Sequence, residues 1–250
     1  MTNDNKYDCV DSMQTKSKKC IYKKKGQNEY VIRRITPGFE SFEFTKDIFS
    51  PEGREDVRDV MLQSPSHRVD GPSYILFFGD QLRSMSYTRY GKLHREDGPT
   101  HTLYHENGAV EKQEWRIMDQ RHRLDDKPAL VEYFDDGEPS FAEFTEYGET
   151  IPNKGVDEAR PDDLIPVDEN CSKIDIAFQM FHMDLQNVYE EEVVSFKVGS
   201  REYEEKYERY KSKGHVHRED GPAEIKYNEL NDVISESWYS RGKLHREDGP

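Results

Sequence analysis

The sequence predicts an all-β protein, either a repeat solenoid or an extended twisted antiparallel sheet of stacked hairpins, with a period of about 28 residues. Three observations predict this fold class. A hexapeptide recurs along the chain, aromatic residues recur in phase with it, and 12% of the residues are aromatic although only 33% are hydrophobic. That composition suits a thin fold, because in a repeat protein each unit contacts only its neighbours.

The hexapeptide, which we call the signature, reads His-Arg-Glu-Asp-Gly-Pro at 94–99, 217–222 and 245–250, with Val in place of Glu at 67–72 and a degenerate copy at 122–128. Asp-Gly favours a turn, since Gly tolerates positive φ and Asp bonds its own backbone. Pro suits the first residue of a strand, because it cannot donate to a ladder. We expect structural roles for His67, Asp70, Gly71, Pro72, His94, Arg95, Asp97, Gly98, Pro99, His122, His217, Asp220, Gly221, His245, Asp248 and Gly249.

Aromatic residues keep two phases relative to the signature, one about ten residues and one about 21 residues after its histidine. Between them lie alternating polar and apolar residues and turn dipeptides such as Asn107-Gly108, so each unit reads as a two-strand hairpin. A single hairpin is marginal in water, so neighbouring hairpins must stack. Equivalent aromatics would then line one inner face, and equivalent His, Arg and Asp one edge. The expected core aromatics are Phe77, Tyr87, Tyr104, Trp115, Tyr133, Phe144, Tyr210, Tyr227 and Trp238.

The organisation along the chain is less regular outside the clear signature copies. The periodicity of residues 172–188 fits a helix face or a strand, and the phase of the repeat favours strands. The expected parts are a basic flexible arm (1–19), diverged N-terminal hairpins (20–66), three clear repeats (67–151), an acidic Pro-containing interruption with a diverged repeat (152–188) and C-terminal repeats (189–250).

Charge and cysteine usage limit the partners and the compartment. The net charge is −15, yet residues 1–35 carry a net of +5, so only this basic region could contact a polyanion or, weakly, a membrane surface. Aromatic interleaving is slight there, so sequence-specific nucleic-acid binding is not expected. Three scattered cysteines and no long apolar stretch indicate a reducing intracellular compartment, the cytoplasm of a host cell, without a transmembrane span. The candidate polyanion contacts are Lys18, Lys19, Lys23, Lys24 and Lys25.

The signature also raises the question of a catalytic or metal site, because it offers His, Arg, Glu and Asp. Each of these elements recurs four or five times in equivalent settings, whereas an active site is seldom duplicated. Histidines about 10 Å apart on successive hairpins cannot share one zinc ion. We therefore predict no enzyme activity, no catalytic residue, no metal and no cofactor. We expect Asp to cap the turn, Arg to pair with a carboxylate, and His to pack beside an aromatic residue.

The pattern resembles the MORN repeat superfamily, in its variant with a Gly-Lys-Leu-His-Arg-Glu-Asp-Gly-Pro core, as at 91–99 and 242–250. Such variants occur in proteins of large DNA viruses of amoebae and in some bacteria. The resemblance implies an elongated β-sheet scaffold that mediates protein assembly, sometimes by homodimerisation, and lipid contact for some members. A virion or capsid-associated structural protein is the setting that a viral origin implies. Two alternatives stay open: a lipid- or polyanion-binding module acting through the basic arm, and a hydrolase using the repeat His and Asp.

The last signature stops at Pro250, the position where a new strand would begin. The strand before it would then lie at a sheet edge, and unprotected edges pair with other chains. We expect this C-terminal edge to contact other proteins, including a second copy of the chain.

Overall fold

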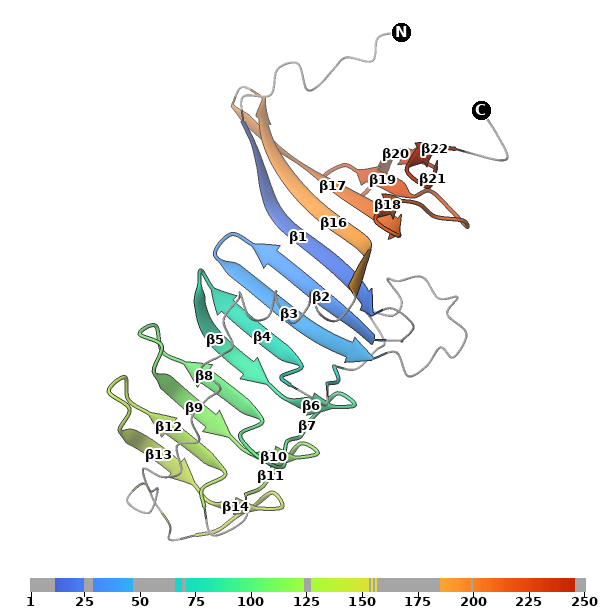
Figure 1. Cartoon of the computed structure of the whole chain (residues 1–250). Helices are drawn as coiled ribbons and strands as arrows, with labels where there is room; N and C mark the ends of the chain where they lie inside the picture. Colours follow the sequence, from blue (N-terminus) through green and yellow to red (C-terminus); the bar gives the residue numbers. More distant parts are fainter. Residues whose placement is uncertain are drawn as a thin grey trace. The chain divides into compact units, whose positions relative to one another are not determined.

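The computed structural model describes residues 12–24, 29–46, 66–68, 71–123, 127–152, 154, 156, 185–198 and 200–245. Over these residues the chain is all-β, a large antiparallel sheet built of hairpins (Figure 1), as the sequence predicts. The chain divides into two compact units, which we describe separately. Unit 1 comprises residues 1–27, 32–37 and 185–250, and unit 2 comprises residues 28–31 and 38–184. Within the described ranges, no helix is long and apolar enough to cross a membrane.

Unit 2 contains a run of hairpins in which sequential strands are neighbours. Three hairpins share a register shift at the first of the two aromatic phases, between Leu76 and Phe77, Leu103 and Tyr104, and Glu132 and Tyr133. A β-bulge therefore recurs at the same point of each hairpin. The strands, in the order of the sheet, are β3 (Phe39–Lys46), β4 (Tyr74–Phe78), β5 (Gln81–Ser86), β8 (His101–Tyr104), β9 (Val110–Glu114), β12 (Leu130–Tyr133) and β13 (Pro139–Glu143).

Short two-residue strands form a second kind of hairpin just before each signature position, and we call these link hairpins. Their two turn residues both have positive φ, for example Tyr90 at 53° and Gly91 at 76°, as in a type I′ turn. Figure 1 shows them in a row beside the sheet of unit 2. They are β6 (Thr88–Arg89) with β7 (Lys92–Leu93), β10 (Arg116–Ile117) with β11 (Gln120–Arg121), and β14 (Thr145–Glu146) with β15 (Glu149–Thr150).

Unit 1 is built around two long strands that join distant parts of the sequence. Its strand order is β1 (Ser12–Lys24), β16 (Leu185–Val198), β17 (Arg201–Ser212), β19 (Glu224–Tyr227) and β20 (Val233–Ser237). The end of β17 forms a link hairpin with β18 (His215–Val216), and β21 (Tyr239–Ser240) forms another with β22 (Lys243–Leu244). The strand β2 (Glu29–Thr36) has residues in both units.

The expected flexible arm is wrong for residues 12–19, because they belong to β1. Lys18 lies opposite Glu192 and Lys19 opposite Glu191 in the antiparallel pairing of β1 with β16. Thr15 Oγ1 donates to the carboxylate of Glu192 at 2.9 Å. Opposite charges on facing strands stabilise such a pairing. The hydrophilic sequence was interpreted as an arm because its acidic partner strand lies far along the chain.

The other diverged segments are strands where the structure describes them. The segment expected to form diverged N-terminal hairpins (20–66) contains the end of β1, β2 and β3. Residues 185–188 begin β16, while most of 152–184 lies outside the described residues.

The expected core aromatics differ in burial. Tyr87, Tyr227 and Trp238 are half-buried, which corrects the expectation that all nine lie in the core. Trp115 and Tyr133 pack with Val131 and Val110 in one cluster. The buried members are Phe77, Tyr104, Trp115, Tyr133, Phe144 and Tyr210.

Candidate functional site

The signature arginine lies over an aromatic ring that precedes it in the chain. The Arg95 guanidinium carbon is 4.0 Å from the centre of the Tyr87 ring, and equivalent arginines lie over Phe44, Trp115 and Tyr210. The distances range from 3.8 Å for Arg123 to 4.2 Å for Arg68. The expected pairing of this arginine with a carboxylate is confirmed for Arg95 with Asp97 and for Arg218 with Asp220, whereas its position over a ring was not expected. The planar guanidinium suits this position, because it stacks on aromatic faces.

The signature glycine makes room for the same guanidinium. A Cβ at Gly98 would lie 2.7 Å from Arg95 Cζ, and one at Gly71 would lie 2.8 Å from Arg68 Cζ. At Gly221 the corresponding distance is 3.2 Å. None of these glycines has a positive φ, so the expectation that Asp-Gly supplies a positive-φ turn is wrong here. Glycine is required for close packing and not for its backbone conformation.

Polar bonds fix the guanidinium in this position. Arg95 Nε donates to Asp97 Oδ1 at 2.8 Å, and Arg218 Nε donates to Asp220 Oδ1 at 2.9 Å. The hydrogen bond from Arg95 holds the pKa of Asp97 below its ordinary value. Arg95 also donates to the carbonyl oxygen of Pro99 at 3.5 Å, and Arg68 donates to that of Pro72 at 3.4 Å. Aspartate therefore orients arginine, and the Asp97 carboxylate also has a hydrogen bond with its own backbone.

The signature histidine contacts the link hairpin that follows it. The rings of His122 and Tyr147 are stacked with centroids 4.0 Å apart, and those of His67 and Tyr90 are 4.7 Å apart. The backbone N–H of Tyr147 donates to His122 Nδ1 at 3.3 Å, and that of Tyr90 to His67 Nδ1 at 3.2 Å. The corresponding bond to His217 Nδ1, at 3.4 Å, comes from the backbone N–H of Arg241.

His94 differs because the next link hairpin turns at Met118 and Asp119 in place of Tyr-Gly. Its buried Nδ1 has no hydrogen-bond partner among the described residues. Asp119 provides a different bond to the same link, because its carboxylate accepts the backbone N–H of Leu93, the residue before His94, at 2.7 Å. The expectation that the signature histidine packs beside an aromatic residue is confirmed for His67 and His122, and the ring is that of the tyrosine in the Tyr-Gly dipeptides at 90–91 and 147–148.

Successive link hairpins are also joined through their backbones. The amide of Gly91 donates to the carbonyl oxygen of Ser66, which precedes the signature histidine of the copy before it, at 2.9 Å. Equivalent bonds join Asp119 to Leu93, Gly148 to Arg121 and Gly242 to Val216, at 2.9 to 3.0 Å. Each signature therefore fastens one hairpin to the next.

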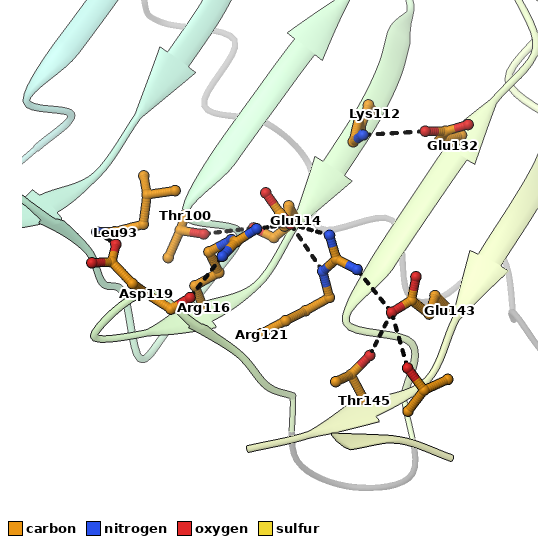
Figure 2. A network of polar contacts seen from close by, with 11 residues as sticks. Leu93, Thr100, Lys112, Glu114, Arg116, Asp119, Arg121, Glu132, Glu143 and Thr145 are labelled. Carbon is orange, nitrogen blue, oxygen red and sulfur yellow. Dashed lines mark hydrogen bonds and ion pairs between the residues drawn. The ribbon is translucent and has the colours of Figure 1, made fainter. Parts of the chain in front are cut away.

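A buried carboxylate joins two hairpins of unit 2 (Figure 2). Glu114 Oε1 accepts hydrogen bonds from Arg116 at 2.7 Å and from Arg121 at 2.8 and 2.9 Å. Arg121 also donates to Glu143 at 2.8 Å, and Thr145 donates to the same Glu143 oxygen at 3.0 Å. Burial alone would raise the pKa of Glu114, but the hydrogen bonds from the two arginines outweigh it and hold the pKa below its ordinary value.

Four of the five candidate polyanion contacts lie in β1. Lys18 and Lys19 lie opposite Glu192 and Glu191, whereas Lys23 and Lys24 lie opposite Gln186 and Leu185. Lys18 Nζ is 4.0 Å from Glu190, and Lys16 pairs with Glu204. Burial lowers the pKa of Lys19 against the opposing effect of Glu191. Lys23 and Lys24 are half-buried, and Lys25 lies outside the described residues.

The structure describes some of the remaining predicted signature residues and not others. Pro72 and Pro99 are buried, and the backbone N–H of the exposed His245 donates to Trp238. Asp70, Asp248 and Gly249 lie outside the described residues. In the part of the chain that the structure describes, no three His, Cys, Asp or Glu side chains form a group that could hold a metal ion.

Comparison with known proteins gave no matching family model, no matching curated protein and no matching solved structure.

Proposed function

We propose that the chain is a non-catalytic scaffold, a solenoid of stacked hairpin repeats that mediates protein–protein assembly through its C-terminal hairpin β19–β20. One observation carries the proposal. Leu230, Val233 and Ile234 are 77%, 50% and 49% exposed on this one hairpin. Contiguous exposed aliphatic residues mark interaction sites more often than they serve a fold.

Comparison with the other hairpins shows that the fold does not require these aliphatic residues. Ile234 is the extra residue of the bulge in β20, where the other hairpins have Arg83, Glu111 and Ser140. Leu230 stands in the middle of its turn, where the other turns have Asn107 and Asp136. Polar side chains satisfy these positions elsewhere. The C-terminal hairpin has therefore gained apolar surface that a partner can cover.

The edge of the sheet offers backbone groups beside this patch. In the described part of the chain, β20 ends the strand order of unit 1 and is bonded to β19 alone. The strand β13 begins with Pro139, which blunts an edge, whereas β20 contains neither Pro nor Lys. An extended strand of another protein, or β20 of a second copy, could pair here by strand addition.

The contacts of the signature support a scaffold over a hydrolase. Its arginine is held by a ring, a glycine and an aspartate, and the Nδ1 of His67, His122 and His217 accepts backbone N–H groups. A general base needs a free nitrogen or oxygen within reach of substrate. The lysines of β1 facing glutamates of β16 and β17 likewise favour a scaffold over a polyanion-binding module.

The test measures absolute mass by light scattering over a dilution series, and partner capture by crosslinking, for the native chain and for a Leu230→Asn, Ile234→Arg variant. We expect the native chain to associate with itself or with a captured protein, and the variant to lose that association. Phe141→Ser, which removes an apolar side chain of similar exposure from β13, is the matched control and keeps it. Equal behaviour of the native chain and the double variant in both assays would overturn the proposal.

A further inference from the structure

The turns of unit 2 carry a second exposed apolar surface, separate from β20. We call it the turn edge, made of residues 38–40, 78–81, 105–109 and 134–138. Phe39, Phe78 and Phe134 are 49%, 47% and 57% exposed on it. Phe39 and Phe78 contact each other edge to face, with ring centroids 4.6 Å apart. Phe78 and Phe134 occupy the same position of two hairpins, directly after a bulge aromatic.

Hydrogen bonds between neighbouring turns hold this surface in place. The amide of Gly79 donates to the carbonyl of Gly38 at 2.7 Å. The side chain of Gln81 donates to the carbonyl of Glu106 at 2.6 Å, and that of Asn107 to the carbonyl of Asp135 at 2.9 Å. The rings are therefore displayed at fixed intervals along the turns and not on independent loops.

The charge of the turn edge has one sign. Its four segments contain six carboxylates and no lysine or arginine. A partner that covers the phenylalanine rings must therefore bring cations. The carboxylates are Glu40, Asp80, Glu106, Asp135, Asp136 and Glu138.

The signature shows how this chain combines an arginine with a ring and a carboxylate, and in unit 1 Lys206 lies over Tyr227 and pairs with Glu208. In the signature, arginine lies over an aromatic ring while its Nε donates to an aspartate, as Arg95 does with Tyr87 and Asp97. On the turn edge, Phe78 is followed two residues later by Asp80, and Phe134 by Asp136. We infer that the turn edge binds an extended, arginine-bearing segment of a partner protein, with one guanidinium on Phe78 and another on Phe134. The inference rests on the proposed assembly function but uses a different surface from β20.

The sheet fixes the spacing of the two arginines. Four strand-to-strand steps, β4 to β5, β8, β9 and β12, separate the two rings. At about 4.8 Å a step the rings lie about 19 Å apart. An extended chain advances about 3.3 Å per residue, so the two arginines stand about six residues apart.

The experiment is an NMR titration of the full chain with a Gly-Ser peptide that carries two arginines about six residues apart. We expect binding that salt weakens, and that falls about tenfold or more in Phe78→Ala, Phe134→Ala, since two cation–π contacts are lost. The matched control is Phe141→Ala, which removes a ring of similar exposure outside the turn edge and leaves binding unchanged. Peptides with lysines, or with the arginines about two residues apart, bind several-fold more weakly.

Two results would overturn the inference. The first is that the arginine peptide does not bind. The second is that the native chain binds the lysine peptide as tightly as the arginine peptide, and that the Phe78→Ala, Phe134→Ala chain binds the arginine peptide as tightly as the native chain does. The second result would show a plain electrostatic surface. Either result leaves the mass and capture assays on β20 unaffected, so failure here is distinguishable from failure of the proposed function.

Discussion

Because the signature glycine contacts the signature arginine, we expect Gly→Ala to lower the unfolding free energy when the arginine is present and to raise it when the arginine is absent. In Gly98→Ala the new Cβ would lie 2.7 Å from Arg95 Cζ, so the guanidinium must leave its place over Tyr87 and beside Asp97. The lost stacking is worth about 0.5–1 kcal/mol and the part-exposed ion pair about 0.5 kcal/mol. Alanine also restricts the unfolded chain, which stabilises by about 0.5 kcal/mol. The expected net loss of unfolding free energy is about 1 kcal/mol.

The same substitution has the opposite effect once Arg95 is removed. In an Arg95→Ala background the three atoms nearest to the new methyl group are gone, and Gly98 has no positive φ to strain it, so Gly98→Ala should stabilise by about 0.5 kcal/mol. Urea unfolding of the four chains, native, both single variants and the double variant, measures the coupling directly. A graded control is Gly221→Ala, where the 3.2 Å approach to Arg218 predicts a smaller loss. Equal effects of Gly98→Ala in both backgrounds would refute the close-packing role of the glycine.

Three further outcomes follow from single contacts. His122→Ala should lower the unfolding free energy by about 1 kcal/mol more than His94→Ala, because His122 stacks on a tyrosine and accepts an N–H, and equal losses would contradict this. Ile21→Ala should cost about 2–4 kcal/mol in thermal unfolding of unit 1, since the residue is 1% exposed in β1, and an unchanged unfolding temperature would contradict this. The depressed pKa of Glu114 gives a stabilisation that is present above about pH 4.5 and is lost as pH falls through the folded-state pKa. The unfolding free energy of Glu114→Gln should therefore fall less steeply with acid than that of the native chain, and an unchanged pH profile would count against the network.

The sequence was sufficient for the all-β class and for the hairpin pattern of unit 2. Asn107-Gly108 carries its turn conformation locally, because glycine tolerates the φ of 86° that Gly108 has in the turn. The bulge at Phe77, Tyr104 and Tyr133 follows the aromatic phase that the sequence already shows.

The strand β1 could not be predicted in the same way, because its pairing with β16 joins residues far apart in the chain. Lys18 and Lys19 give no local sign of a strand, and only the glutamates opposite them make the pairing favourable. Charge complementarity of this kind becomes visible only when the register is known. The packing role of Gly98 could not be predicted for a related reason. Glycine in a sequence indicates a turn or a positive φ, and it does not indicate that the side chain of Arg95 approaches closely.

Hydrogen exchange of the link-hairpin amides tests most directly whether the signature fastens one hairpin to the next. The amides of Gly91, Asp119 and Gly148 stand at turns, where exposed amides exchange quickly, yet each donates to the carbonyl before a signature histidine at 2.9 Å. The account predicts protection of these three amides comparable to that of β8 and β9, and a loss of protection at Gly148 in His122→Ala. Exchange of these amides at the rate of free turns in the native chain would contradict it.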